Sequence, residues 1–560
     1  MRIEINDEIL LKVGKPARYI GGEWNSVIKD YKDIKCKIVL AFPDVYEVGM
    51  SHLGLKILYS LLNDRRDIAC ERVFAPWFDM EGVMRERKIP LFSLETKRPL
   101  AEFDIIGFSL QYELSYTNVL NMLDLAGIPL FSAERGDSHP LIIGGGPCVF
   151  NPEPMADFFD CFLIGDGEEA AAEIADIFID SGEKGDKKEG LLKRLAEVEG
   201  VYVPSLAAKQ AGTAKRVKKR SVLNLDEAYY PERPVVPYIE IVHDRIQLEI
   251  MRGCRRRCNF CQAGVIYRPN RQRSAEKLIS LAEKIYKNTG YDEISLISLS
   301  SGDHSHIMEI AASLKRLFED KGVGISFPSL RVEDLVSKFP IELASGNPAC
   351  RAGRHTGLTF APEVGSEKMR KVINKDISPA TLKECALEAF KNGWRRIKLY
   401  FMIGLPEEDY SDLDAIVELA KEVSEVKKNL DGRPAEINAS VSIFIPKPHT
   451  KFERAAMLPM DEAEKKQGYI RDKARRTRVK FTFHDARMSY LEAALTRGDM
   501  SLGKVIYNAW KNGCRFDGWS EYFNLDKWKA AFNEAGIDPD FYALRQRGPD
   551  EILPWGFIEL

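Results

Sequence analysis

The chain has 560 residues, a length that predicts two to four domains. Its formal net charge of −3 is close to neutral, so composition alone does not indicate a nucleic-acid-binding protein, and an anionic partner would need a local basic patch. Ten cysteines do not fit a secreted disulfide framework, and no apolar run is long enough to span a bilayer, so we expect a cytoplasmic protein without membrane contact.

Residues 1–35 form an N-terminal extension of mixed charge, and a regular pattern begins at Cys36. Five apolar runs then alternate with helical patterns, at 36–42, 68–75, 103–110, 140–146 and 161–169. This alternation predicts a doubly wound α/β domain with a parallel sheet over 36–205. Such sheets bind ligands beyond the carboxyl ends of their strands. Glycines at those ends permit close backbone approach: Gly144, Gly145, Gly146, Gly165 and Gly167, the last followed by Glu168.

A change of composition over 206–244 predicts a linker between domains. Its basic run at 214–222 is typical of a solvated connector, and contact with an anionic substrate such as RNA is the alternative.

A cysteine motif dominates the stretch 247–264. An apolar strand leads into Cys254, Cys258 and Cys261, with the aromatic Phe260 directly before the last cysteine. A structural zinc site or a closed iron–sulfur site has four protein ligands. Three thiolates are one ligand short of this number and leave one metal position open. The alternatives are a zinc knuckle without its fourth cysteine, or a redox pair with a bystander. We expect the nearby arginines to lower the pKa of the thiols: Arg252, Arg255, Arg256 and Arg257.

Residues 245–450 repeat the alternation of strands and helices. The cysteine strand is followed by apolar runs at 293–301, 324–330, 355–363, 395–404 and 436–445, so six strands predict an open (βα)6 barrel. Residues 451–560 predict a helical C-terminal cap, basic between Arg471 and Lys480. We expect its tryptophans to pack on the barrel; a nucleic-acid cradle that includes Arg475, Arg476 and Arg478 is the alternative.

The cysteine spacing at the end of a first strand resembles the radical S-adenosylmethionine (SAM) superfamily. The segments DVYEVGMSHLGL, GFSLQYE, IIGGGPCVFNPEP and IGDGEE resemble loops of the cobalamin-binding domain that precedes the barrel in cobalamin-dependent members. Residues 512–528 resemble the tail of a bacterial subfamily of unknown substrate, often paired with a small radical-SAM-linked domain.

The resemblance implies that Cys254, Cys258 and Cys261 hold a [4Fe–4S] cluster, which cleaves SAM to a 5′-deoxyadenosyl radical. The positions implied to bind SAM are Phe260, Ser301, Gly302, Asp303, Ser329, Arg331, Glu363 and Gly404, with Ser301 and Asp303 departing from the Gly-Gly-Glu pattern of the family. The positions implied to bind cobalamin are Gly107, Ser109, Gln111, Tyr112, Gly144, Gly145, Gly146, Gly165, Gly167 and Glu168. The histidine signature that supplies a lower cobalt ligand in many cobalamin proteins is missing after the first strand, so we expect a cobalt face without histidine and assign His52 to a helix start.

The implied activity is cobalamin-dependent methyl transfer to an unactivated carbon. Radical cyclisation, rearrangement, other radical SAM chemistry and RNA modification are enzymatic alternatives, and a cobalamin or redox sensor is the non-enzymatic one. The implied partners are an electron donor such as flavodoxin or ferredoxin, a small radical-SAM-linked protein, and a small-molecule or RNA substrate.

Overall fold

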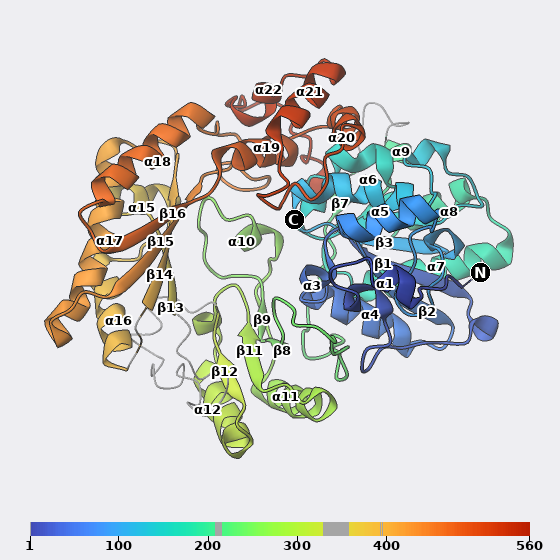
Figure 1. The fold of residues 1–560 in the computed structure, drawn as a ribbon, viewed down its shortest axis with the longest axis horizontal. Coiled ribbons are helices and arrows are strands. Elements are labelled where there is room, and N and C mark those ends of the chain that lie inside the picture. The colour runs from blue at the N-terminus through green and yellow to red at the C-terminus, as the bar shows by residue number, and fades with distance from the viewer. Residues whose placement is uncertain (1, 208–215, 329–357, 393, 395) are drawn as a thin grey trace.

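The computed structural model describes residues 2–207, 216–328, 358–392, 394 and 396–560. In Figure 1 an N-terminal α/β domain lies at the right, a four-stranded sheet lies at the left, and a three-stranded sheet lies between them. The C-terminal helices run across the top, from the four-stranded sheet to the N-terminal domain (Figure 1). Among the described residues, no helix has the length and apolar character needed to cross a membrane.

The N-terminal domain is built on one six-stranded sheet with the order β2-β1-β3-β4-β5-β6. Its strands are β1 (Cys36–Phe42), β2 (Ile68–Phe74), β3 (Ile105–Ser109), β4 (Leu141–Gly145), β5 (Cys161–Leu163) and β6 (Val201–Tyr202). The first five are parallel and were all predicted, whereas β6 pairs antiparallel with β5 and was not. Two residues are too few to give a periodic signal.

Helices cover both faces of this sheet, because successive side chains of each buried strand point to opposite sides. Ile38, Leu40 and Ile143 pack with α4 (Leu53–Asp64), α7 (Glu168–Lys184) and α8 (Lys188–Leu195). On the other face, the core includes α5 (Phe78–Arg87) and α6 (Tyr116–Leu125). The strand order reverses between β1 and β3, the kind of point at which open α/β sheets bind ligands. The shorter helices here are α1 (Asp7–Leu10), α2 (Ala17–Ile20), α3 (Tyr46–Gly49) and α9 (Pro204–Ala207).

The described part of the expected linker is anchored to the protein. Its strand β7 (Val217–Lys218) pairs with β17 (Ile558–Glu559) near the end of the chain. Lys219 is buried and donates to the carbonyl of Ile266 (3.0 Å), while Arg220 pairs with Glu169 and Glu173 on α7. The interpretation of this basic run as a solvated connector was therefore wrong for Lys219 and Arg220, whose charges meet carbonyls and acidic residues, whereas the side chain of Lys218 is 69% exposed.

The second domain contains two parallel sheets. The first has the order β12-β11-β8 and consists of β8 (Ile246–Glu249), β11 (Glu293–Ile297) and β12 (Gly324–Ser326). After β8, strand β9 (Met251–Arg252) pairs antiparallel with β10 (Arg271–Gln272), and the cysteine loop lies between these two strands in sequence. The helices of this half are α10 (Ala263–Ile266), α11 (Ala275–Thr289) and α12 (Ile307–Phe318).

The second sheet has the order β13-β14-β15-β16. It comprises β13 (Leu358–Glu363), β14 (Arg396–Ile403), β15 (Glu436–Ile443) and β16 (Val479–Phe483), with α15 (Glu367–Ile373), α16 (Pro379–Lys391), α17 (Tyr410–Asp431) and α18 (Met460–Ala474). Strand β16 lies in residues 451–560, which were predicted to be helical, so that prediction was wrong for this segment. In its sequence VKFTF, apolar and polar residues alternate with the period of a strand, but the surrounding basic residues obscured this pattern.

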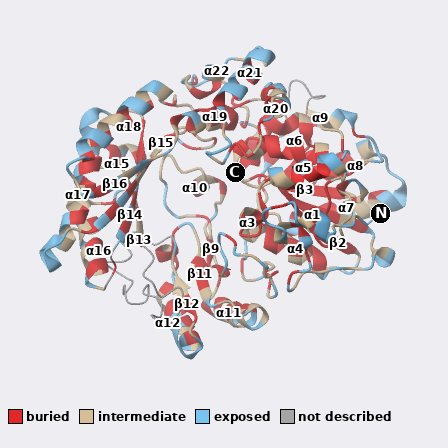
Figure 2. Cartoon of the chain, in the orientation of Figure 1, coloured by how far each residue is buried: buried red, intermediate tan, exposed pale blue. Residues whose placement is uncertain are grey.

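The C-terminal helices are α19 (Ala486–Thr496), α20 (Leu502–Lys511), α21 (Leu525–Ala535) and α22 (Pro539–Ala543). The sequence predicted that this region packs on the barrel. In the structure it also contacts the N-terminal domain, because α20 packs against α6. Trp519 meets Trp77 edge to face at 5.6 Å, and its indole N–H donates to Asp44 at 3.0 Å. The buried residues accordingly continue from the N-terminal sheet into these helices (Figure 2).

Candidate active site

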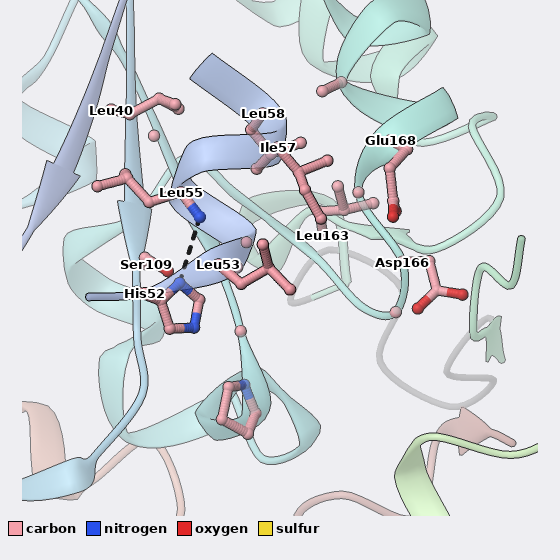
Figure 3. Close-up of a pocket in the computed structure, with 18 of the residues that line it drawn as sticks. Leu40, His52, Leu53, Leu55, Ile57, Leu58, Ser109, Leu163, Asp166 and Glu168 are labelled. Atoms are coloured by element: carbon pink, nitrogen blue, oxygen red, sulfur yellow. Dashed lines mark hydrogen bonds between the residues drawn. The ribbon is translucent and has the colours of Figure 1, made fainter. Parts of the chain in front are cut away.

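A cavity of about 450 Å³ lies over β1, β3, β4 and β5, on the face of the sheet that α4 and α7 cover, and it extends past the carboxyl ends of the last three strands. Apolar side chains from these strands and from α4 form its body, including Leu40, Ile57, Leu58 and Leu163 (Figure 3). His52 lies at one side of this apolar region, and Asp166 and Glu168 lie at the other (Figure 3). The second domain supplies the remaining wall, from Glu249, Met251, Arg252, Gly253, Tyr267, Ile297, Ser298 and Leu299. Both domains therefore shape one cavity.

Glycine keeps the β4 side of the cavity open at Gly145. This residue shares its face of β4 with Ile143, which also lines the cavity, and the nearest heavy atom to a Cβ added there would be 4.0 Å away. The neighbouring Gly144 faces the other side, where a Cβ would come within 2.6 Å of the Phe162 ring. The chain thus needs glycine for its own packing at Gly144, whereas at Gly145 a side chain would occupy ligand space.

The sequence-based cobalamin positions converge on this cavity with one exception. Gly107, Ser109, Gln111, Gly144, Gly145, Gly146, Gly165, Gly167 and Glu168 line it. Tyr112 is the exception, because its hydroxyl donates to Glu492 on α19 at 2.9 Å. Gly165 also has a local requirement, since its φ is 116° and an added Cβ would lie 2.1 Å from the carbonyl oxygen of Arg220.

His52 is the N-cap of α4, as the sequence predicted. Its Nδ1 accepts a hydrogen bond from the backbone N–H of Leu55 at 3.2 Å. Burial lowers the pKa of His52 to about 4, so the ring is neutral near pH 7. Because Nδ1 acts as the acceptor, the ring proton is assigned to Nε2, which then offers no lone pair to a metal.

A buried ionic network forms the polar edge of the cavity. Arg252 on β9 contacts Asp166 (3.0 Å), Glu168 (2.6 Å) and Glu249 (2.9 Å), and Arg271 also binds Asp166. Burial disfavours the charged Asp166 carboxylate, but Arg252 and Arg271 outweigh this effect and hold the pKa of Asp166 below its usual value.

The expectation that the arginines lower the pKa of the thiols is therefore corrected in two respects. Arg252 is neutralised by carboxylates, and Arg256 pairs with Asp303 at 2.8 Å. Burial raises the pKa of Cys261, although the N–H of Gly264 donates to its sulfur at 3.3 Å.

The loop that carries the three cysteines is fixed at its start and in its middle. Gly253 has φ of 83°, and a Cβ there would lie 2.5 Å from the carbonyl oxygen of Tyr267, so only glycine fits. In the middle of the loop, Asn259 donates through its backbone N–H to Ile373 (2.9 Å) and through its side chain to Val372 (2.7 Å). Helix α15 thereby holds the loop in place.

Within the residues that the structure describes, Cys254, Cys258 and Cys261 are not disulfide-bonded, and all three have intermediate exposure. In the described part of the chain, no three His, Cys, Asp or Glu side chains are arranged to hold a single metal ion. A [4Fe–4S] cluster does not need its ligands to meet at one point, because each thiolate binds a different iron. Three accessible thiols on one anchored loop fit such a cluster better than a mononuclear zinc site.

Among the described residues, two of the positions implied to bind SAM lie beside this loop: Asp303, which pairs with Arg256 of the loop, and Glu363, whose charge acts on Cys261. Phe260 packs against a group of buried apolar side chains that includes Val364, Met402 and Phe444. Ser301 and Gly302 are buried, and the hydroxyl oxygens of Ser301 and Ser298 lie 2.9 Å apart.

Glu363 and Gly404 have partners within the chain, and the remaining SAM positions lie outside the described residues. Glu363 ends β13 with φ of 67° and accepts from Lys375 at 2.8 Å. The N–H of Gly404 donates to Glu408 at 2.9 Å. Ser329 and Arg331 lie outside the residues that the structure describes.

Sequence reasoning missed the apolar body of the cavity and its wall from the second domain. The helical pattern that includes Ile57 and Leu58 indicated only core packing, since an amphipathic face looks the same whether it covers a sheet or lines a cavity. Asp166 stands in the quoted IGDGEE segment, but the role of Arg252 had no local signal because its partners are distant in sequence.

Two family models match the chain. Residues 54–204 match the N-terminal domain of radical SAM proteins, and residues 248–420 match the radical SAM superfamily. An uncharacterized protein of Methanocaldococcus jannaschii is 29% identical over 502 residues, which are 89% of this chain and 97% of that protein. An uncharacterized methyltransferase of Pyrococcus horikoshii is 24% identical over 302 residues, which are 52% of this chain and 60% of the relative.

Solved structures share the fold. The radical SAM methyltransferase TsrM of Kitasatospora setae, with tryptophan and a SAM analogue bound, matches with a TM-score of 0.51 and 13% identity, covering 75% of each chain. The cobalamin-dependent radical SAM enzyme OxsB, with aqua-cobalamin and SAM bound, matches with a TM-score of 0.51 and 14% identity, covering 89% of this chain and 70% of OxsB.

Proposed function

Because this chain belongs to the radical SAM superfamily, we propose that it is a cobalamin-dependent methyltransferase that acts on an unactivated carbon. One observation carries the proposal: the cavity in the N-terminal domain shares a wall with the strand that leads to the cysteine loop. Glu249, Met251, Arg252 and Gly253 line the cavity, and Cys254 follows directly.

The residues of the cavity suit a large ligand with a ring system and polar side groups. Leu40, Leu58 and Leu163 offer an apolar slot that excludes water, and Gly145 leaves room for a ring at the strand end. Gln111 and Glu168 at the rim can bind amide groups such as those around a corrin ring.

Cys254, Cys258 and Cys261 would hold the cluster, with SAM at its open iron, and α15 would keep the loop in position. When bound, the cluster supplies one electron for the reductive cleavage of SAM, and cobalamin supplies the methyl group. Glu363 and Asp303 lie beside the loop as carboxylates able to receive the amino group of SAM, at present paired with Lys375 and Arg256.

Two observations favour methyl transfer over cyclisation or rearrangement with the same cofactors. The chain is similar to a methyltransferase of Pyrococcus horikoshii and shares its fold with the methyltransferase TsrM. A sensor needs no SAM-binding groups around the cluster loop, so Asp303 and Glu363 favour an enzyme. We further propose a flavodoxin or ferredoxin as reductant, a small radical-SAM-linked protein as partner, and a small molecule or RNA as substrate.

An anaerobic product assay tests the proposal. The protein is reconstituted with iron, sulfide and hydroxocobalamin and given SAM and a strong reductant, and 5′-deoxyadenosine and S-adenosylhomocysteine are quantified. We expect retained cobalamin and both products, and loss of 5′-deoxyadenosine in the Cys258→Ala variant. 5′-Deoxyadenosine without cobalamin retention or S-adenosylhomocysteine would contradict methyl transfer and leave only the superfamily assignment.

A further inference from the structure

One arginine connects the two parts of the candidate site. Arg252 lies two residues before Cys254, and its guanidinium binds carboxylates from both domains. Asp166 and Glu168 belong to the N-terminal domain and flank Gly167 at the start of α7, whereas Glu249 ends β8 of the second domain. Charge-assisted hydrogen bonds of this kind are stronger and geometrically more specific than neutral ones.

This connection is buried. The side chains of Arg252, Asp166, Glu168 and Glu249 are 11%, 9%, 8% and 13% exposed. Arg252 therefore interacts with its partners with little screening by solvent. Asp166, Glu168, Glu249 and Arg252 also all line the cavity, so a ligand there would meet the same groups that fix the start of the cysteine loop.

We propose that Arg252 is a positioning residue that couples occupancy of the N-terminal cavity to the reduction potential of the cluster bound by the cysteine loop. The inference rests on the proposed function, because it takes cobalamin as the ligand of the cavity. A ligand that contacts Asp166 or Glu168 changes the position or hydrogen bonding of that carboxylate, and Arg252 transmits the change to the loop. Such coupling is reciprocal: a ligand that shifts the potential must bind the oxidised and reduced forms with different affinities.

The sign of the direct charge effect follows from electrostatics. Reduction adds one negative charge to the cluster, which a nearby cation favours and a nearby carboxylate disfavours. Replacing Arg252 by a neutral residue leaves Glu168 and Glu249 without this cation beside the loop. The Arg252→Gln cluster should therefore have a lower potential than the wild-type cluster.

The test is a redox titration of the cluster followed by EPR, with and without hydroxocobalamin, in the full-length protein. Wild type is compared with Arg252→Gln and Arg252→Lys. The control is Arg245→Gln, which removes an arginine paired with Glu293 (2.8 Å) just before β8, at the end of that strand away from the cysteines. Iron and sulfide content and a spectrophotometric cobalamin titration are measured in parallel.

We expect cobalamin to shift the wild-type potential by about 59 mV, which corresponds to a tenfold difference in affinity between the two oxidation states. The shift should persist in Arg245→Gln and disappear in Arg252→Gln, whose potential should also be lower without cobalamin. Arg252→Lys keeps the charge but cannot reach three carboxylates in a fork, so it should lose the shift while its cobalamin-free potential stays near that of wild type. If Arg252→Gln does not fold, the Arg252→Lys variant alone tests whether Arg252 couples cobalamin binding to the cluster potential.

An equal cobalamin shift in wild type and Arg252→Lys would overturn the coupling and leave the proposed function intact. A wild-type protein that binds cobalamin without any shift would do the same. A wild-type protein that assembles a cluster and retains no cobalamin would overturn both proposals.

Discussion

Gly145 provides the most direct test of the cavity at the scale of a residue. In the Gly145→Val variant, the side chain has space within the protein, because the nearest heavy atom to the new Cβ is 4.0 Å away, but it enters the cavity. Valine also suits a strand. We expect folding to be retained and cobalamin affinity to fall by at least about tenfold, since a filled slot excludes the ligand.

Equilibrium titration with hydroxocobalamin, followed by absorbance, measures this effect. Gly82→Ala in α5 is the control, because Gly82 does not line the cavity and an added Cβ meets no atom within 4 Å. Unchanged cobalamin affinity in Gly145→Val would show that the ligand binds elsewhere.

Individual site residues were predictable from sequence where their role is local. Gly145 and Gly167 stand at recognisable strand ends, and His52 stands at a helix start, so short-range pattern located them. Tyr112 was placed at the cavity by its neighbours in sequence, but it points to Glu492, a partner 380 residues away that no local pattern reveals. The pairing of Arg252 was unpredictable for the same reason.

At the scale of elements, Asp517 joins α6 to α21. Its carboxylate accepts from the Thr117 hydroxyl (2.8 Å) and the Trp528 indole N–H (3.0 Å). Burial raises the pKa of Asp517 to about 6 despite these two donors. The folded state thus holds the proton more tightly than the unfolded chain, where the pKa is near 3.8.

This shift fixes the direction of a pH effect. The stabilisation is complete at low pH and is lost as pH rises from about 4 to about 6, by roughly 3 kcal/mol at 1.36 kcal/mol per pKa unit. Asp517→Asn removes the titration, and Thr117 can reorient its hydroxyl to accept from the amide. We expect this variant to gain unfolding free energy relative to wild type between about pH 4.5 and about pH 7.5.

Thermal unfolding midpoints at the two pH values measure the difference. Glu521→Gln, an exposed position in the same segment, controls for the removal of one negative charge. If wild type and Asp517→Asn differ by the same amount at both pH values, Asp517 does not titrate in this range.

Elements with strong periodicity were predicted well, and short or disguised ones were not. The five parallel strands of the N-terminal sheet are largely apolar because both faces of the sheet are buried, and even Glu71 and Arg72 of β2 are buried. Strand β6 has two residues, and β16 lies on the edge of its sheet, where polar side chains alternate with apolar ones. Edge strands carry a weaker signal because one part of their surface stays solvated.

At the scale of the whole molecule, Lys447 ties three parts of the chain together. It follows β15 and pairs with Glu113 (3.2 Å), which follows β3, and with Glu492 (2.8 Å) on α19. Burial alone would lower the pKa of Lys447, but the two glutamates raise it above its usual value, so the lysine stays charged. Both domains and the C-terminal helices therefore meet at one cation.

Lys447→Met should destabilise the protein by roughly 3 kcal/mol, because two largely buried carboxylates lose their cation. Denaturant unfolding measures the loss. Lys465→Met is a matched control on α18, since Lys465 also pairs with two acids, Asp461 and Glu462, but is 58% exposed. We expect a change below about 1 kcal/mol there. Equal effects of the two substitutions would argue against the role of Lys447 as a link between domains.

The order of the domains could be predicted from sequence, but their contacts could not. Alternating strands and helices identify two α/β units, whereas the packing of Trp519 on Trp77 depends on surfaces from opposite ends of the chain. The aromatic residues of the C-terminal region were expected to pack on the barrel, and nothing in their spacing indicated contact with the N-terminal domain. The shared cavity wall is likewise a property of the assembled molecule.

Anomalous diffraction can show directly whether cobalamin occupies the N-terminal cavity while the three cysteines hold iron. Crystals of the anaerobically reconstituted protein with hydroxocobalamin are measured at the cobalt and iron absorption edges. We expect cobalt at the N-terminal cavity, beside Gly145 and the start of α4, and iron at Cys254, Cys258 and Cys261. Iron at the cysteines with cobalt absent, or bound outside the cavity, would contradict this expectation.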